Sequence, residues 1–196
     1  MPTMLDLFSG AGGASAAMVD RGWRVVTVDN NPAHHPEICA AVEEMALADA
    51  AALSWIGTVA LLWASPPCTE FSRESMPWCK TGREPDLSLV RATLRIVEEV
   101  GPRWWCIENV RGSLKWLRPL LGKPLVSTGP IFLWGRLPPM IVPKVDPYKE
   151  RITGERPDLR SKLPYHLSMA VALACEAALS PPTTPAASAL SEGEER

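Results

Sequence analysis

The stretch Asp6-Leu7-Phe8-Ser9-Gly10-Ala11-Gly12-Gly13 decides the fold class. The apolar residues 4–7 that lead into it predict a short buried strand, and the small residues 14–21 that follow it predict a helix that stops at Gly22. A strand that runs through a glycine-rich turn into a helix lets a ligand approach the backbone closely. Many α/β proteins use such a turn only for tight packing, so by itself it is weak evidence for a ligand site.

The rest of the chain continues this alternation of strands and helices. Apolar runs predict strands at residues 24–28, 59–64, 104–107 and 126–134, the last as one strand. Residues 36–47, 87–100 and 164–179 are predicted to be helices. The alternation is typical of an α/β protein whose mostly parallel sheet carries helices on both faces. Residues 138–160 predict a proline-rich loop, and residues 180–196 predict a disordered tail.

Acidic residues follow the second strand and a later helical segment. Asp29 and Asn30 come at the end of the second strand, where an acidic side chain commonly accepts hydrogen bonds from ribose hydroxyls. Asp49 is a candidate for contacting an adenine amino group, with a plain surface carboxylate as the alternative. Because no G-K-[ST] phosphate-binding signature is present, the pattern favours a nucleoside-containing cofactor over a P-loop nucleotide.

The third strand ends at Ser65-Pro66-Pro67-Cys68. The two prolines stiffen the chain and fix a thiol at the carboxyl edge of the sheet, where ligands bind in this class of protein. A positioned thiolate is a strong nucleophile, and nearby cations raise the thiolate fraction. A packed loop cysteine is the alternative interpretation.

The fourth strand ends at Glu108-Asn109-Val110 and faces the same edge as Cys68. A carboxyl group there can hold or donate a proton to a ring nitrogen of a bound base. A structural carboxylate that caps the following helix is the alternative interpretation.

In this order and spacing, the four motifs resemble those of the C5-cytosine DNA methyltransferase family over about the first 110 residues. Residues 160–165 resemble the closing segment of short, phage-type members. The resemblance implies a Rossmann-like fold that binds S-adenosylmethionine. The residues that it implies for the cofactor site are Phe8, Gly10, Gly12, Asp29, Asn30, Asp49 and Pro66, and those for catalysis are Cys68, Glu108 and Asn109.

The resemblance also implies a reaction. Cys68 would attack C6 of a cytosine flipped out of duplex DNA, Glu108 would hydrogen-bond or protonate N3, and C5 would take the methyl group. Residues 69–85 would form a mobile loop that closes over the base. The Gln-x-Arg-x-Arg segment that the family usually carries is absent, which leaves the second contact to the base open. Candidate substrate contacts are Arg73, Arg83, Arg111 and Arg136.

The predicted organisation is a single catalytic domain over residues 1–179, followed by the tail at residues 180–196. Residues 137–160 stand where the family carries a target-recognition domain, and they are far fewer than the roughly 50 residues of a small independent domain. We therefore expect a short or relaxed target site, or a partner subunit that supplies recognition.

Composition sets the remaining limits. The net charge of −2 does not indicate a nucleic-acid binder. Residues 68–123, however, carry ten basic and seven acidic side chains. This local positive excess is either a phosphate-contacting face or a solvated surface of mixed charge. The five cysteines are widely spaced without a C-x-x-C pair, so we expect no metal site and no disulfide framework. No apolar run is long enough for a membrane span and no signal peptide is recognisable, which predicts a cytoplasmic protein.

Two alternatives to a DNA methyltransferase remain open. One is methylation of cytosine in RNA or in a free nucleotide, which the missing recognition domain allows. The other is a non-catalytic subunit that binds S-adenosylmethionine or DNA and needs a partner.

Overall fold

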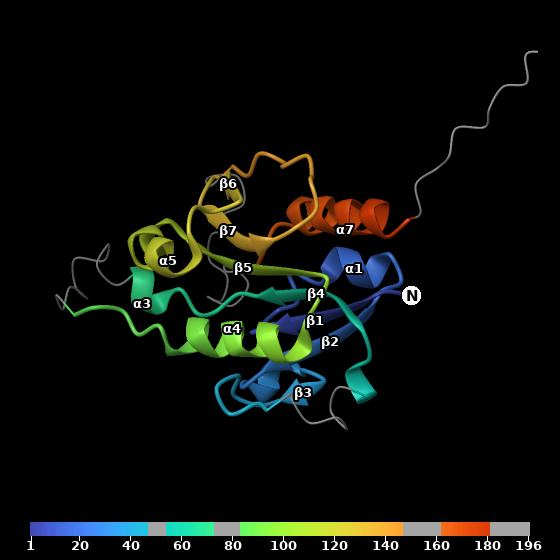
Figure 1. The fold of residues 1–196 in the computed structure, drawn as a ribbon, viewed down its shortest axis with the longest axis horizontal. Coiled ribbons are helices and arrows are strands. Elements are labelled where there is room, and N and C mark those ends of the chain that lie inside the picture. Colours follow the sequence, from blue (N-terminus) through green and yellow to red (C-terminus); the bar gives the residue numbers. More distant parts are fainter. Residues whose placement is uncertain (47–53, 73–82, 147–161, 181–196) are drawn as a thin grey trace, which may run out of the picture.

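A seven-stranded sheet forms the centre of the protein (Figure 1). The computed structural model describes residues 1–46, 54–72, 83–146 and 162–180. The strands lie in the order β3-β2-β1-β4-β5-β7-β6. Their bounds are β1 Thr3–Leu7, β2 Arg24–Asp29, β3 Ile38–Cys39, β4 Val59–Ala64, β5 Trp104–Val110, β6 Val126–Thr128 and β7 Ile131–Arg136. Strands β1 to β5 pair in parallel, whereas β7 is antiparallel to both β5 and β6. The predicted mostly parallel, Rossmann-like sheet is confirmed.

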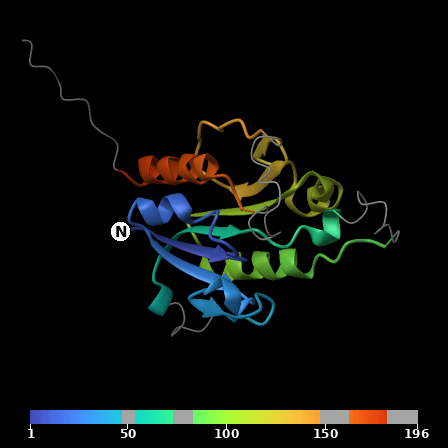
Figure 2. The ribbon, with the colours of Figure 1, turned by 180° about the vertical axis from the view of Figure 1, so that it is seen from behind.

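Helices cover both faces of this sheet. They are α1 Ala16–Asp20, α3 Thr69–Ser72, α4 Ser88–Val100, α5 Leu114–Leu121 and α7 Tyr165–Leu179, with the 3-10 turns η1 Pro32–His34 and η3 Arg111–Ser113. Side chains from α1 and α7 share one hydrophobic core with the sheet, and side chains from α4 and α5 share the other. Seen from behind, α1 and α7 lie together on one side of the sheet and α4 lies on the other (Figure 2).

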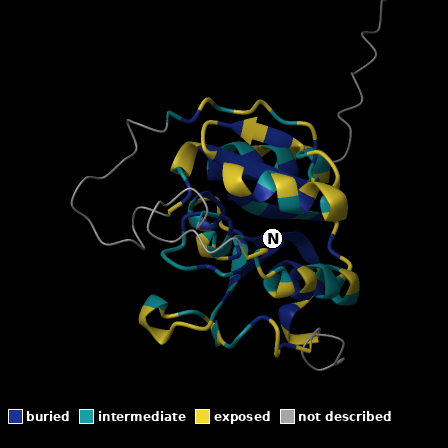
Figure 3. Ribbon diagram, turned by 90° about the vertical axis from the view of Figure 1, so that its left-hand side faces the viewer, coloured by how far each residue is buried: buried dark blue, intermediate teal, exposed yellow. Residues whose placement is uncertain are grey.

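The strands are the most buried part of the molecule (Figure 3). Every residue of β1 and β4 is buried, because helices cover both faces of these central strands. The side chains of β4 alternate between the two cores. Leu61 and Trp63 pack in the core that includes α1 and α7, whereas Leu62 and Ala64 pack in the core that includes α4 and α5. The apolar runs that predicted these strands therefore reflect burial on two sides.

Polar contacts fasten α7 to α1, although about 150 residues separate them in the chain. The Arg21 guanidinium pairs with the Glu176 carboxylate, which also accepts a hydrogen bond from Trp23 Nε1 at 2.9 Å. Tyr165 Oη donates to Asp20 Oδ2 at 2.7 Å. These contacts hold the C-terminal helix against the end of α1. Among the described helices none is long and apolar enough to cross a membrane.

Two secondary-structure predictions are wrong. Residues 36–46 form the short strand β3 and a turn in place of a helix, because Ile38 and Cys39 pair with the edge of β2. Apolar spacing alone does not separate these outcomes in a short segment. Residues 126–134 contain two antiparallel strands that turn at Gly129-Pro130, not one strand. Helix α5 was not predicted from the sequence, and its last turn contains Pro119.

Candidate active site

The carboxyl ends of β1, β2, β4 and β5 meet at one edge of the sheet. Register pairs Ala64 of β4 with Leu7 of β1 and with Ile107 of β5. The residues that follow these positions therefore lie next to one another. This arrangement brings the glycine-rich turn, Cys68 and Glu108 to the same edge, as the four motifs predicted.

The glycine-rich turn bends sharply away from β1. Phe8, Gly10 and Gly12 all have positive φ values, of 59°, 47° and 70°. Glycine adopts this region freely, whereas a phenylalanine there stores backbone strain of about 1–3 kcal/mol. The turn is held by hydrogen bonds from Ser9 N to Val28 O at 3.0 Å and from Gly12 N to Ser9 O at 2.8 Å.

The Asp29 carboxylate connects the ends of β1 and β2. Its Oδ2 accepts a hydrogen bond from Gly10 N, and its Oδ1 accepts one from Asn31 N, both at 2.8 Å. Asp29 therefore organises the glycine-rich turn in addition to its predicted role as a ribose ligand. The carboxylate is partly exposed and each oxygen has a second lone pair, so it can accept further hydrogen bonds.

Asp6 is a buried carboxyl beneath the same turn. Its side chain is 1% exposed, and neither oxygen has a hydrogen-bond partner within the described part of the chain. Burial raises the pKa of Asp6 from 3.8 to about 7; the nearby Ser15 side chain lowers it in part, and the negative charge of Asp29 adds to the rise. A buried acid without a partner is costly to ionise, and a cationic ligand group beside it would remove that cost.

The C-terminal segment closes over the glycine-rich turn. A methyl group at Gly13 would collide with the backbone of Leu163 and the side chain of Lys162. The Ser168 hydroxyl donates to Ala14 O at 2.6 Å and accepts from Ala17 N at 3.2 Å. Lys162 and Leu163, which belong to the segment that resembles a closing segment, thus lie against the predicted cofactor turn.

Cys68 follows β4 through a rigid connection. Pro66 is buried and its carbonyl accepts a hydrogen bond from Asn109 Nδ2 at 3.0 Å, which ties the cysteine loop to the end of β5. The Cys68 carbonyl accepts hydrogen bonds from Phe71 N and Ser72 N, so the residue begins α3. Its side chain is partly exposed, whereas Cys106 and Cys175 are buried in the core and burial raises the pKa of both thiols.

Glu108 lies beside Ser65, the residue that follows β4. Burial raises the pKa of the Glu108 carboxyl from 4.5 to about 7, although a hydrogen bond with the Ser65 side chain lowers it in part. The Ser65 hydroxyl in turn accepts a hydrogen bond from Trp63 Nε1 at 2.8 Å. This chain of contacts holds a carboxyl that can carry or release a proton near neutral pH, which is the property of a general acid.

The four candidate arginines divide into different environments. Arg111 is exposed on η3, directly after β5, at the same edge as Cys68. Arg83 pairs with Glu70 of α3 at 3.7 Å. Arg136 lies opposite Trp105 near the start of β5, and its guanidinium donates to Pro102 O at 2.8 Å. The structure thus places Arg136 at the far end of the sheet, because β7 runs antiparallel to β5.

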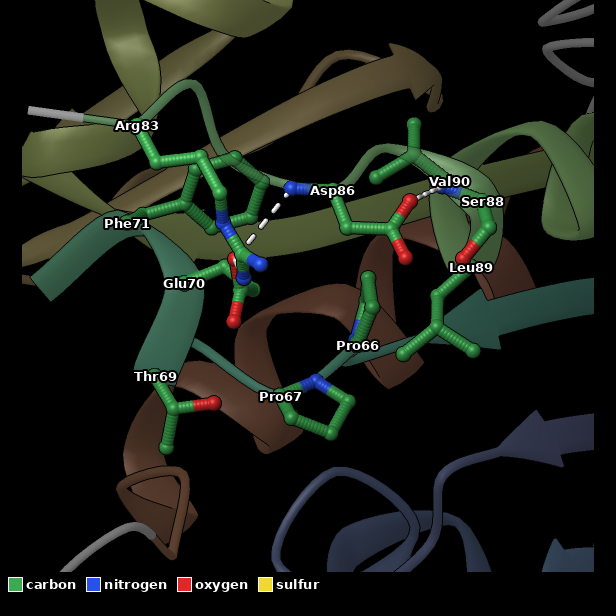
Figure 4. A pocket seen from close by; sticks show the side chains of 10 residues that line it. All are labelled: Pro66, Pro67, Thr69, Glu70, Phe71, Arg83, Asp86, Ser88, Leu89 and Val90. Carbon is green, nitrogen blue, oxygen red and sulfur yellow. Dashed lines mark hydrogen bonds and ion pairs between the residues drawn. The ribbon is translucent and has the colours of Figure 1, made fainter. Parts of the chain in front are cut away.

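A small pocket of about 140 Å³ adjoins the cysteine loop (Figure 4). Pro66, Pro67 and the first residues of α3 form one wall, and Ser88, Leu89 and Val90 of α4 form another. Glu70 Oε2 accepts a hydrogen bond from Asp86 N at 3.2 Å across its rim. Asp49, Arg73 and residues 73–82 of the predicted mobile loop lie outside the described residues. No group of side chains suited to a metal ion occurs in the portion that the structure describes.

A family model for C-5 cytosine-specific DNA methylases matches residues 2–116, which is more than half of the chain. The chain belongs to this family. The matched region of the chain contains the glycine-rich turn, Cys68 and Glu108, and it ends within α5. No curated protein matches the chain.

Solved methyltransferase structures also resemble the methylase. A DNA modification methyltransferase encoded within an E. coli prophage is 21% identical over 60% of this chain and 34% of its own, with a TM-score of 0.45. S. pombe Dnmt2 is 22% identical over 57% of this chain and 35% of its own, with a TM-score of 0.39. Entamoeba histolytica EhMeth is 15% identical over 74% of this chain and 56% of its own, with a TM-score of 0.48. The methylase spans about a third of the first two chains.

Three residues of the candidate site were missed by sequence reasoning. Asp6 lies within the first motif, but its burial without a partner depends on both faces of the sheet being covered. Ser65 precedes the prolines, and its position beside Glu108 follows from the pairing of β4 with β5. Ser168 supports the glycine-rich turn across more than 150 residues of chain, and no local signal in the sequence predicts that contact.

Proposed function

We propose that the methylase transfers a methyl group from S-adenosylmethionine to C5 of cytosine in duplex DNA, through a covalent bond between Cys68 Sγ and C6 of the base. The main support is the meeting of Cys68 and Glu108 at one sheet edge, beside a strained glycine-rich turn. Family membership supports methylation of cytosine C5. The donor, the covalent step and the DNA substrate are our inference.

The residues at the turn fit S-adenosylmethionine. The methionine end of this molecule carries a cationic ammonium group, and the buried, unpartnered carboxyl of Asp6 is a suitable counter-charge. Phe8, Gly10 and Gly12 would hold the cofactor against the exposed backbone of the turn, and Asp29 would accept hydrogen bonds from the ribose. Further cofactor contacts would come from Asn30, Asp49 and Pro66. When bound, S-adenosylmethionine supplies an electrophilic methyl group.

The chain's own residues activate the base. The Cys68 thiolate forms a bond to C6 of cytosine while Glu108 donates a proton to N3, so the electrons of the C5–C6 double bond become available at C5. C5 then accepts the methyl group. Loss of the C5 proton to solvent and departure of the Cys68 thiolate restore the C5–C6 double bond. Return of the N3 proton to Glu108 then releases neutral 5-methylcytosine and regenerates the acid. Asn109 would act as a positioning residue, because its amide fixes the loop that carries Cys68.

The proposed organisation follows from the length of the connection between β7 and α7. Residues 1–179 would form one catalytic domain, and residues 180–196 would be a tail. Residues 137–160 stand in place of a target-recognition domain, and reading a sequence in the major groove needs an element with several base-reaching side chains. We therefore propose a short or relaxed target, or recognition supplied by a partner subunit. The target cytosine must leave the duplex stack to reach Cys68.

Methyl transfer to DNA tests the proposal directly. Purified protein is incubated with S-adenosylmethionine and unmodified duplex DNA, and the digested nucleosides are quantified by mass spectrometry. We expect 5-methyldeoxycytidine with the wild type and a loss of at least about a thousandfold in Cys68→Ser, since removing a covalent nucleophile costs other enzymes at least that much. Cys39→Ser is the matched control, because it makes the same change at an exposed thiol on β3.

Other outcomes separate the alternatives. Methylation of RNA or free cytidine nucleotides, without methylation of DNA, would contradict the assignment of DNA as the substrate. It would leave the proposed methyl-transfer mechanism intact. Binding of S-adenosylmethionine without methyl transfer to any of these substrates would contradict catalysis by this chain alone and favour a subunit that needs a partner.

A further inference from the structure

We propose that the exposed face of η3 and α5, formed by Arg111, Lys115 and Arg118, binds the phosphate backbone of duplex DNA beside the catalytic cysteine. We call this face the basic stripe. The inference rests on the proposed function and assigns a surface by which a methylase with a short recognition segment holds its substrate.

The segment of chain that contains the stripe carries charges of one sign only. Residues 110–145 contain no aspartate or glutamate, although charged residues make up 21% of the chain. The same 36 positions carry six cations, Arg111, Lys115, Arg118, Lys123, Arg136 and Lys144. Four of the six lie within the first 14 positions. An uninterrupted run of cations produces a positive field that attracts a polyanion.

Helical geometry gathers two of these cations on one face, and a third lies on the turn before them. Lys115 and Arg118 are three residues apart on α5, so they lie on the same side of that helix. Arg111 lies on η3, which leads directly into α5. All three are exposed, whereas Leu117 on the opposite side is fully buried in the core. Within the described residues, none of the three forms a salt bridge. Lys115 Nζ lies over the ring of Trp116 at 4.4 Å, which leaves its charge available to solvent.

The stripe begins directly beside the helix that Cys68 starts. Gly112 of η3 packs so closely on the carbonyl of Phe71 in α3 that a methyl group at this position would overlap it. Figure 1 shows α3 and α5 at the same end of the sheet, and Figure 2 shows the same arrangement from behind. A duplex that lies along α5 would therefore pass next to Cys68. This is the position from which a flipped base reaches the thiol.

The length of the stripe suits a DNA strand. The rise is about 2.0 Å per residue over the 3-10 turn and about 1.5 Å per residue over α5, which separates Arg111 from Arg118 by roughly 12 Å. Phosphates follow one another at about 3.4 Å of axial rise per strand, so the stripe spans about three of them. Each neutralised phosphate contributes a slope of about −0.9 in log affinity against log salt, which corresponds to roughly eightfold in affinity at 0.1 M salt.

The test compares two variants that remove cations from different ends of the acid-free segment. Lys115→Gln/Arg118→Gln removes two charges of the stripe. Arg136→Gln is the control, because Arg136 is an exposed cation of the same segment at the far end of the sheet. Binding of a fluorescent duplex is measured by anisotropy at several salt concentrations. The single variants Lys115→Gln and Arg118→Gln, with thermal melting, guard against loss of fold.

The stripe predicts that the double variant binds about 60-fold more weakly at 0.1 M salt and that its salt slope falls by about two. In each single variant the salt slope falls by about half as much as in the double variant. The affinity of Arg136→Gln for DNA stays within twofold of the wild-type affinity. A loss of affinity in Arg136→Gln equal to that in each single variant would overturn the inference in favour of a diffuse charge effect. Unchanged affinity in the double variant would overturn it outright.

Methyl transfer keeps this failure separate from failure of the proposed function. If wild type methylates DNA and the double variant binds DNA normally, the stripe is wrong and the activity stands. If the double variant loses affinity but regains the wild-type rate at saturating DNA, the stripe acts in binding, as proposed. Tighter binding of duplex RNA than of DNA, lost in the double variant, would overturn the assignment to DNA. A wild type that binds no duplex would overturn both proposals.

Discussion

Replacing Asp6 with asparagine is expected to make the free energy of unfolding decrease less as pH rises. The same substitution is expected to weaken the binding of S-adenosylmethionine. Both effects come from the same buried carboxyl, whose oxygens have no hydrogen-bond partner in the described structure. The substitution keeps the shape of the side chain and removes its charge. It therefore separates the electrostatic role of Asp6 from its packing.

The size of the stability effect follows from the pKa. The pKa of Asp6 is raised from 3.8 to about 7, a shift of about three units. At 1.36 kcal/mol per unit, ionisation costs the folded state at most about 4 kcal/mol. Because the pKa of Asp6 is raised in the folded state, its protonated carboxyl contributes fully to the free energy of unfolding below about pH 3.8. This contribution is lost as pH rises through about 7. The asparagine variant loses this pH dependence, although its buried amide costs about 1–3 kcal/mol at every pH.

Urea unfolding between pH 4 and pH 8 measures the change. The quantity to compare is the fall in unfolding free energy across this range, which is expected to be smaller in Asp6→Asn than in the wild type by up to about 4 kcal/mol. Glu108→Gln serves as a second variant, since burial also raises the pKa of Glu108 to about 7. Equal pH dependence in wild type and Asp6→Asn would refute the reasoning about the buried charge.

Calorimetric titration with S-adenosylmethionine measures the second effect. In the wild type, affinity is expected to rise as pH increases through about 7, because the ionised carboxyl is the form that attracts the ammonium group. In Asp6→Asn, affinity is expected to be lower at pH 8 and nearly independent of pH over this range. Wild-type affinity in the variant at pH 8 would refute the role of Asp6 as a counter-charge.

Three further predictions concern the same site. In Ser65→Ala, the hydrogen bond that lowers the pKa of Glu108 is lost, so that pKa is expected to rise. The pH at which the single-turnover methylation rate declines on the alkaline side should therefore increase. No change in that pH would contradict proton donation by Glu108. Gly13→Ala is expected to lower the melting temperature and the affinity for S-adenosylmethionine, because the added methyl group collides with Leu163 and separates the closing segment from the turn; unchanged values of both would contradict that packing. Arg136→Gln is expected to leave the methylation rate within twofold of the wild type, and a large loss would restore Arg136 to the active site.

The sequence alone predicted the central strands because they are buried on both faces. Apolar runs with turn signals at their ends identify such strands well, and this held for β1, β2, β4 and β5. Residues 36–46 were misread as helix, because pairing of Ile38 with the edge of β2 outweighed apolar spacing. The turn at Gly129-Pro130 was a usable signal for two strands, since glycine and proline together mark a turn.

The candidate site was predictable where its residues follow parallel strands. Cys68 follows β4, and Glu108 lies near the end of β5, which runs parallel to β4, so both residues were expected at one edge of the sheet. The position of Arg136 could not be predicted, because the direction of β7 cannot be read from its composition. Since β7 is antiparallel to β5, Arg136 lies opposite Trp105, near the start of β5. The contact of Leu163 with Gly13 depends on how the C-terminal helix docks, which only the folded structure reveals.

Covalent capture of DNA by Cys68 is the most direct test of the account. A duplex that contains 5-fluorodeoxycytidine is incubated with the methylase and S-adenosylmethionine, then resolved on a denaturing gel. Fluorine at C5 cannot leave as a proton does, so the bond between Cys68 Sγ and C6 is expected to persist as a protein–DNA complex. The complex is expected with the wild type and Cys39→Ser, and peptide mapping is expected to locate it at Cys68. Formation of the complex in Cys68→Ser, or methylation of normal DNA without any captured complex, would contradict the central claim.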